Sequence, residues 1–345
     1  MSTYDTATLV HVVKNLKTSQ NFLLDKFFPQ EVKSDQEEVD IDVDVGKRRM
    51  SPFVSPLVEG KLVQSRRYQT NKFKPAYIKD KRAPDLLKPV KRMIGEKIGG
   101  ELTQGEREAA NLEMEMTDQV DMLNRRMEWM AGSALSTGTV TISGEGFPTS
   151  VVDFGRDSGL TLALTSGAVW NAANIAAGTA SPSGDIETWQ QSILKKSGAV
   201  VTDIVFTPKA WKVFKLDPEF KASIQYPTLA EFGNRINPGA EIKHGAVYKG
   251  RWGQYDLWVY SDWYVDDNDV EHPMLVDGTV ILSGSNLEGV RAFGTIKDPE
   301  FNYQALAFAP KTWVEKDPAQ RIILMQSAPI VIPTRVNASM AVVVN

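Results

Sequence analysis

The sequence contains no cysteine, and this absence excludes several kinds of chemistry. Without cysteine there is no disulfide framework, thiol nucleophile, cysteine-bound zinc or iron–sulfur cluster. Histidine is also scarce, since the chain has only His11, His244 and His272, which lie far apart in sequence. The stability of this 345-residue chain must therefore come from packing or from assembly with other copies.

The sequence also lacks the common catalytic motifs. It has no GxSxG elbow, no HExxH and no phosphate-binding loop. Gly144 and Gly146 begin a GxGxxG pattern, but the third position is Thr149 and the surroundings read as strand, turn and strand. Sequence alone leaves open whether two carboxylates meet as in a glycosidase, because it does not give their separation. We expect that the protein is not an enzyme and that it has no catalytic residue, no cofactor and no bound metal.

The sequence pattern predicts neither a secretory signal nor a membrane-spanning segment. Asp5 precedes the first apolar stretch and no basic residue does. Residues 158–184 carry no charge, but they include nine Ser, Thr and Asn, four Gly and Pro182. We expect surface loops and short strands there, in a protein made in the cytoplasm without membrane contact.

Charge is distributed unevenly along the chain. Residues 46–99 hold 15 Lys and Arg against four acidic residues, a net +11, so the rest carries −15 within a total of −4. Such a segment, interleaved with aromatic residues, fits nucleic-acid binding. It also fits contact with an acidic surface of a neighbouring copy. The basic residues that we expect in such a contact are Arg66, Arg67, Lys72, Lys74, Lys79, Lys81 and Arg82.

A long helix is predicted directly after the basic segment. Thr103 and Glu106 have the spacing of a capping box. Apolar residues then follow on one helical stripe: Leu112, Met116, Val120, Leu123, Met127, Met130 and Ala134. About 30 residues at ~1.5 Å each give a helix of ~45–50 Å. Its outer face is acidic and offers the expected partner for the basic segment, through Glu106, Glu108, Glu113, Glu115, Asp118 and Asp121.

The remaining pattern predicts an α+β fold of strands with short helices. Residues 37–45 alternate as a strand, and Asp40, Asp42 and Asp44 only mimic a calcium loop. An exposed turn is favoured over a cation site for residues 266–269. The other expected elements are a hairpin at 139–143 and 149–154, helices from Asp185 to Ser197 and from Thr207-Pro208, and strands at 200–206, 255–265, 273–282, 290–296 and 321–331.

Six segments carry a family resemblance. They are PFVSPLVEGKLVQSR at 52–66, FKPAYIK at 73–79, GEGFPTSVVDFGR at 144–156, VFTPKAWKVF at 205–214, AVYKGRWGQYDLWVYSDWYV at 246–265 and PKTWVEKDPAQRIILMQSAPI at 310–330. Together with the order of elements, they resemble the major capsid (head) proteins of lambda-like tailed phages, which have the Hong Kong 97 capsid fold.

The resemblance implies a domain organisation and a set of partners. Residues 1–45 would be an N-terminal arm, 46–100 an extended loop, 101–157 a peripheral domain with the long helix, 158–324 an axial domain, and 325–345 a strand returning to the peripheral domain. Subunits would form hexamers and pentamers of an icosahedral head. The head would enclose double-stranded DNA without sequence specificity. The resemblance also implies a separate scaffolding protein, a portal and a decoration protein.

Two other functions stay open at this point. An encapsulin-type nanocompartment shell has the same fold and differs by holding protein cargo without DNA. A nucleic-acid-binding protein acting through residues 46–99 would instead bind DNA as an isolated subunit, with a steep dependence on salt.

Overall fold

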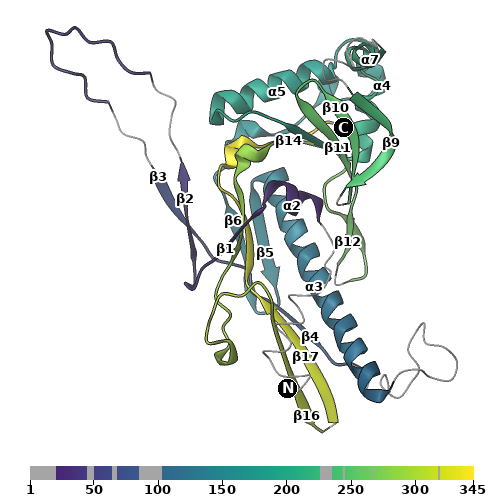
Figure 1. The fold of residues 1–345 in the computed structure, drawn as a ribbon. Coiled ribbons are helices and arrows are strands. Elements are labelled where there is room, and N and C mark those ends of the chain that lie inside the picture. Colours follow the sequence, from purple (N-terminus) through teal and green to yellow (C-terminus); the bar gives the residue numbers. More distant parts are fainter. Residues whose placement is uncertain are drawn as a thin grey trace.

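The computed structural model describes residues 21–44, 50–63, 68–84, 103–225, 235–243, 245–266, 268–317 and 319–345. Residues 1–20 and 45 of the expected N-terminal arm lie outside these ranges, as do Arg66, Arg67 and His244. In the part of the chain so described, no helix is long and apolar enough to cross a membrane. The described residues form six sheets and ribbons together with helices, and Figure 1 shows their arrangement.

The long helix predicted after Thr103 is confirmed as α3, Gln104–Thr137, with 34 residues. Thr103 and Glu106 form the expected capping box, which satisfies two free N–H groups at the first turn. The helix ends at Gly138, whose left-handed conformation (φ 75°) suits glycine. Its apolar stripe faces the protein interior, so α3 forms the long axis on which the other elements pack (Figure 1).

The larger half of the molecule surrounds a seven-stranded sheet with the order β7-β19-β14-β8-β11-β10-β9. Its strands are β7 (Thr161–Ala163), β8 (Asp203–Phe206), β9 (Arg235–Lys243), β10 (Ala246–Trp252), β11 (Tyr255–Tyr260), β14 (Thr279–Ser283) and β19 (Met340–Val343). Four helices accompany it, α4 (Ala172–Ala176), α5 (Pro182–Ser197), α6 (Pro208–Phe214) and α7 (Pro218–Gln225). An aromatic core fills the space, with Trp170 stacked on Trp189 and Phe214 against Phe206. This half is the mixed α+β unit predicted from the sequence.

The start of α5 differs from the sequence prediction. The helix begins at Pro182, with Ser181 as N-cap, and not at Asp185. Proline at the first helical position and serine just before it are both favourable for a helix start. Asp185 instead accepts a hydrogen bond from the indole Nε1 of Trp170 at 2.7 Å. The expected loops of residues 158–184 therefore include helical turns as well as strand β7.

Three smaller strand groups lie along α3. One sheet has the order β1-β15-β18, with β1 (Gln30–Lys33), β15 (Gly289–Phe293) and β18 (Pro329–Pro333). A second has the order β16-β17-β4, with β16 (Ala309–Lys316), β17 (Ala319–Ser327) and β4 (Ile78–Arg82). The predicted hairpin is confirmed as β5 (Thr139–Gly144) and β6 (Phe147–Asp153). The C-terminal segment divides between the two halves, because β18 packs on α3 whereas β19 joins the large sheet.

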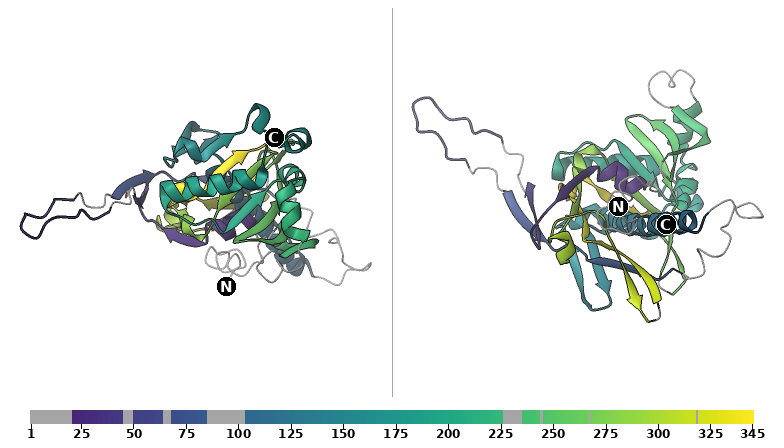
Figure 2. Two further views of the ribbon diagram at one scale, coloured as in Figure 1. Left: turned by 90° about the horizontal axis from the view of Figure 1, so that it is seen from above. Right: turned by 60° about the horizontal axis from the view of Figure 1, so that its bottom comes forward.

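The basic segment also divides into two parts. Strand β2 (Val39–Asp44), predicted from the alternation of residues 37–45, pairs with β3 (Tyr68–Phe73) to form a ribbon. Residues 50–63 extend beyond this ribbon and project away from the body, to the left in Figures 1 and 2. In contrast, Ile78–Arg82 pairs with β17 inside a sheet. Among the described residues of the segment expected as an extended loop, 50–63 therefore project from the subunit, whereas 78–82 lie in a sheet.

Candidate inter-subunit surfaces

The projecting residues 50–63, called the tip loop below, expose apolar side chains to solvent. Phe53 is fully exposed, and Leu57 and Leu62 are 94% and 98% exposed. Met50, Val58 and Val63 are exposed as well. An exposed group of this size usually marks a surface that another molecule covers. Sequence analysis considered the charge of this segment and missed its apolar residues, which have no helical or strand periodicity to draw attention.

Most of the described basic residues have acidic or aromatic partners in the same chain. Lys74 and Lys297 both contact Glu37, at 3.4 and 3.0 Å between nitrogen and oxygen. Together they lower the pKa of Glu37, with Lys297 the larger cause. The other contacts are Lys72 with Glu38 at 3.9 Å, Lys81 with Glu315 at 3.6 Å and with the Trp313 ring, and Lys79 over the Tyr77 ring.

Arg82 links the end of β4 to the acidic face of α3 in its own subunit. Its Nη1 lies 3.1 Å from Glu115 and 2.5 Å from Asp118, and its Nε lies 3.2 Å from Asp80. Burial lowers the pKa of the guanidinium, but the hydrogen bonds to Asp118 and Glu115 outweigh it, so the pKa is raised overall. Part of the charge complementarity predicted between subunits is thus satisfied within one chain.

On the rest of the acidic helix face, some acidic residues have partners in the same chain and others are exposed. Glu106 belongs to the capping box, and Glu108 lies 3.9 Å from Arg321. Glu113 is exposed beside Met114, a large apolar residue that is also exposed. These two line a shallow hollow of about 410 Å³, together with Ala110, Thr117, Asp118 and Asp121. This part of α3 offers an acidic surface with an apolar centre.

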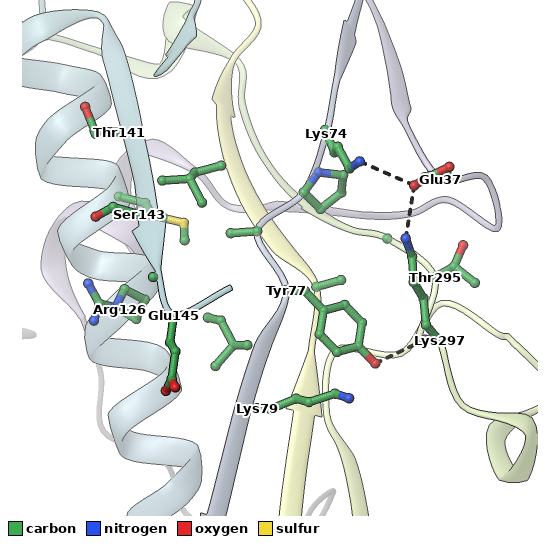
Figure 3. A pocket seen from close by; sticks show the side chains of 18 of the residues that line it. Glu37, Lys74, Tyr77, Lys79, Arg126, Thr141, Ser143, Glu145, Thr295 and Lys297 are labelled. Carbon is green, nitrogen blue, oxygen red and sulfur yellow. Dashed lines mark hydrogen bonds and ion pairs between the residues drawn. The ribbon is translucent and has the colours of Figure 1, made fainter. Parts of the chain in front are cut away.

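A larger pocket of about 740 Å³ lies between α3, β5 and the segment before β4 (Figure 3). Figure 3 shows Tyr77 on one side of it, where its hydroxyl accepts a hydrogen bond from the backbone N–H of Lys297 at 3.1 Å. The same hydroxyl donates to Gln326 at 2.8 Å. Arg126 lies against the ring of Trp129 on the helix side. The lining mixes apolar and charged groups without a nucleophile beside a base, so it resembles a contact surface more than a catalytic site.

Two ionisable residues, the buried Glu128 and the partly buried Arg156, hold α3 to the rest of the subunit. Glu128 is completely buried and accepts hydrogen bonds from the backbone N–H groups of Leu23 (2.9 Å) and Leu24 (2.8 Å) in α2 (Phe22–Phe27), and from the Tyr260 hydroxyl (2.8 Å). Burial raises its pKa to about 7. Arg156 donates to carbonyl oxygens in the last turn of α3, and burial lowers its pKa to about 10. Sequence analysis identified neither residue, because their partners lie far away in sequence.

The acidic turn at residues 266–269 lies at the end of a small hairpin, β12 (Trp263–Val265) and β13 (Glu271–Pro273). Asp266 accepts hydrogen bonds from the backbone N–H groups of Val270 and Asn268, each at 2.9 Å. These bonds lower its pKa to about 2. Among the residues that the structure describes, no group of three or more His, Asp and Glu is arranged to hold a metal ion.

Comparisons with known proteins agree with this architecture. The sequence matches the phage major capsid protein E family over residues 5–344. It is 30% identical to the major capsid protein of Escherichia phage N15 and 29% identical to that of Escherichia phage lambda, each over 96% of both chains. The fold resembles that of the putative capsid protein of a prophage of E. coli CFT073, with a TM-score of 0.74, 21% identity and 99% of both chains covered. The capsid of Ralstonia phage GP4 is a more distant match, with a TM-score of 0.52, 14% identity, and 95% of this chain and 91% of that chain covered.

These matches extend over nearly the whole chain, in agreement with the Hong Kong 97 type of fold expected from its sequence. The chain belongs to the phage major capsid protein E family.

Proposed function

We propose that this chain is the repeating subunit of an icosahedral phage head and assembles into hexamers and pentamers around double-stranded DNA. The observation that carries the proposal is the tip loop, whose large apolar side chains are exposed in the single subunit. A subunit that covers this loop with a second copy buries apolar surface, which is favourable. Family membership supports the same conclusion.

The expected domains follow from this function with two adjustments, one to the extended loop and one to the C-terminal segment 325–345, whose last strand β19 joins the seven-stranded sheet. The arm, peripheral domain and axial domain keep the ranges given above, while the extended loop is the segment between β2 and β3. We infer that the basic residues near the tip loop, Arg66 and Arg67 in the sequence, approach the acidic hollow on α3 of a neighbour. Glu113 is exposed there, and Asp118 is 62% exposed although it also contacts Arg82 of its own chain. Arg82 is assigned to its own α3.

Other partners belong to the proposal through family resemblance. A scaffolding protein, a portal and a decoration protein would act during or after assembly, which would take place in the host cytoplasm. The role is structural, and no catalytic step is assigned to the chain. A structural protein of this kind contributes to the shell its surfaces for contact with other subunits and a rigid fold.

Neither alternative has a specific observation in its favour. A nucleic-acid-binding protein would present free cations, whereas most of the described lysines and arginines of the basic segment contact acidic groups of the same chain. A nanocompartment shell has the same architecture, but the sequence match is to a phage capsid family.

Electron microscopy of the purified protein tests the proposal. The parent chain, alone and with its scaffolding partner, should form capsomer rings or closed shells. A variant with Phe53→Ser, Leu57→Ser and Leu62→Ser should remain monomeric, because it lacks the apolar surface. Val151→Ser and Val314→Ser together provide a control, since both valines are also exposed but lie outside the tip loop. Monomers alone under all conditions for the parent chain would contradict the proposal.

A further inference from the structure

Helices α6 and α7 carry a group of lysines that have no acidic partner among the residues that the structure describes. Lys209 and Lys212 lie on α6, Lys215 directly follows that helix, and Lys221 lies on α7. Each of these lysines is exposed, and none of them has an ion pair with a described carboxylate. This group of residues, called the lysine face below, is therefore open to contact with another molecule.

The aromatic core beneath the two helices directs the lysines outward. Phe220 of α7 packs on Trp211 and Phe214 of α6, with ring centroids 5.9 and 4.5 Å apart. These three rings are buried, so the side of each helix that carries them faces the protein. The lysines at 209, 212 and 215 recur every third residue, which places them next to one another along the outer side of α6. Figure 1 shows α7 at the upper edge of the molecule.

The segment packed beside α6 adds no negative charge. Residues 158–184 contain no charged residue, and their Trp170 packs on Phe214 of α6 with the ring centroids 6.1 Å apart. This segment is rich in Ser, Thr and Asn. The positive charge of the lysine face is therefore not offset from this side, although the chain as a whole has a net charge of −4.

The two acidic residues within α6, α7 and the turn between them are Asp217 and Glu219. Asp217 is 2% exposed, and its carboxylate accepts hydrogen bonds from the N–H and hydroxyl of Ser183 and from the N–H of Glu219. It therefore faces the interior and not the lysines. Glu219 is exposed on α7 and offsets one of the four lysine charges. The surface of the two helices remains clearly positive.

The chemistry of the lysine face fits phosphate groups better than a protein surface. Leu216, which is 38% exposed, is its one large exposed apolar side chain in the described part of α6, α7 and their turn. The centres of protein–protein interfaces are rich in apolar and aromatic residues and poor in lysine. A row of lysines without an apolar centre is instead typical of contacts with the phosphate backbone of nucleic acid, which need no base recognition.

We propose that the lysine face of α6 and α7 contacts the phosphate backbone of duplex DNA inside the shell. The inference rests on the proposed function and adds to it the surface that meets the DNA. The lysine face is separate from residues 46–99, and a single subunit offers so few cations that it binds DNA only weakly. Many copies in a shell repeat the contact, and repetition increases the overall strength of binding.

Salt-dependent DNA binding by the unassembled full-length chain tests the contact. Fluorescence anisotropy with two duplex DNAs of unrelated sequence gives the affinity at several salt concentrations. Each phosphate contact contributes about −0.9 to the slope of log affinity against log salt. The variant with Lys209→Gln, Lys212→Gln, Lys215→Gln and Lys221→Gln should bind about tenfold more weakly or worse, and its slope should be less steep by about 3.

A control variant has the same change in net charge at exposed positions elsewhere. It carries Lys33→Gln, Arg125→Gln, Lys297→Gln and Lys316→Gln. Its affinity for DNA should fall by less than about twofold. Glutamine is a good helix former, so the lysine-face variant should fold, and its urea unfolding midpoint should match that of the parent chain. Equal affinities and slopes for the two variants would overturn the proposal.

The absence of cysteine from the chain permits a second measurement. Lys212→Cys, labelled with a photoreactive azide, should become covalently attached to DNA on irradiation at low salt. Val314→Cys on β16, which is also exposed, should not. Attachment at both positions or at neither would contradict a contact through the lysine face.

The remaining outcomes separate this contact from other partners and from the proposed function. A marked preference of the parent chain for one of the two DNA sequences would overturn a contact with the backbone alone. A lysine-face variant that needs a higher subunit concentration for ring formation without DNA would assign the lysines to an acidic surface of a neighbouring subunit and overturn the proposal. Absence of rings for the parent chain would overturn the proposed function, whereas the DNA measurements decide the contact on their own.

Discussion

Helix α3 and the tip loop differ in burial and in hydrogen bonding, two properties on which stability depends. The helix is hydrogen-bonded at both ends and holds a buried carboxylate in its middle, whereas all residues from 50 to 63 are exposed. The contrast indicates that the chain has two separate parts. One is its frame, α3 with the residues that pack on it and bind it, and the other is its contact surface, the tip loop. Substitutions in the frame should therefore destabilise the subunit, and substitutions in the tip loop should impair only assembly. The predictions below test this division, from the largest expected loss of stability to the smallest.

Arg156 should be the most sensitive position of the frame. It donates hydrogen bonds to the carbonyl oxygens of Ala134 (3.0 Å) and Leu135 (2.7 Å) and to the Ser339 hydroxyl (2.9 Å). Arg156→Ala removes the donor to the Leu135 carbonyl and to the Ser339 hydroxyl, and it leaves the Ala134 carbonyl with the Gly138 N–H alone. We therefore expect the free energy of unfolding to fall by about 3 kcal/mol. Urea unfolding of the unassembled subunit measures this value. Arg125→Ala, an exposed control on α3, should change it by less than about 0.5 kcal/mol. Equal losses for both would contradict the prediction.

Glu128 should have the next largest effect. Glu128→Gln replaces one acceptor oxygen with an NH₂ group, which faces a backbone N–H of α2 or the Tyr260 hydroxyl and cannot accept its hydrogen bond. We expect a loss of about 2 kcal/mol near neutral pH, measured by urea unfolding. Glu113→Gln, an exposed change on the same helix, is the matched control and should have almost no effect.

Glu128 should also make stability depend on pH. Its pKa is about 7 in the folded protein, above the value of about 4.3 expected in an unfolded chain. Between these values the folded state binds more protons, so stability falls as pH rises from about 4.5 to 7 and then levels off. Glu128→Gln should remove this part of the pH dependence. An unchanged pH profile in the variant would assign the dependence to other groups.

Sequence analysis predicted the local features of α3 well and its long-range contacts poorly, and the reason is physical. The capping box and the apolar stripe are local signals, so the start of α3 at Thr103 was predicted, and its length of 34 residues was expected as about 30. The Glu128 and Arg156 contacts join residues more than 20 positions apart, and no local pattern encodes them. The partner of Arg82 illustrates the same limit. Its charge was predicted to meet the acidic helix, but sequence could not show that the helix belongs to the same subunit.

Arg82 should show a smaller effect on stability than Glu128 and Arg156. Its side chain is 21% exposed, and Asp118 is mostly in solvent. We expect Arg82→Ala to lower the free energy of unfolding by about 1 kcal/mol. A double-mutant cycle with Glu115→Ala isolates the part due to that contact. A contact made with a neighbouring subunit would instead leave the unassembled subunit unchanged and would show its coupling only in assembled rings.

The tip loop should show the smallest effect on subunit stability. Leu57 is 94% exposed in the folded subunit, so folding removes almost none of its apolar surface from water. Leu57→Ser should therefore change the free energy of unfolding by less than about 0.5 kcal/mol, while ring formation requires a higher subunit concentration. Unfolding in urea and light scattering during assembly measure the two quantities on the same sample. A loss of stability equal to that of Arg156→Ala would mean that the loop packs on its own subunit in solution, and the frame and the contact surface would no longer be separate.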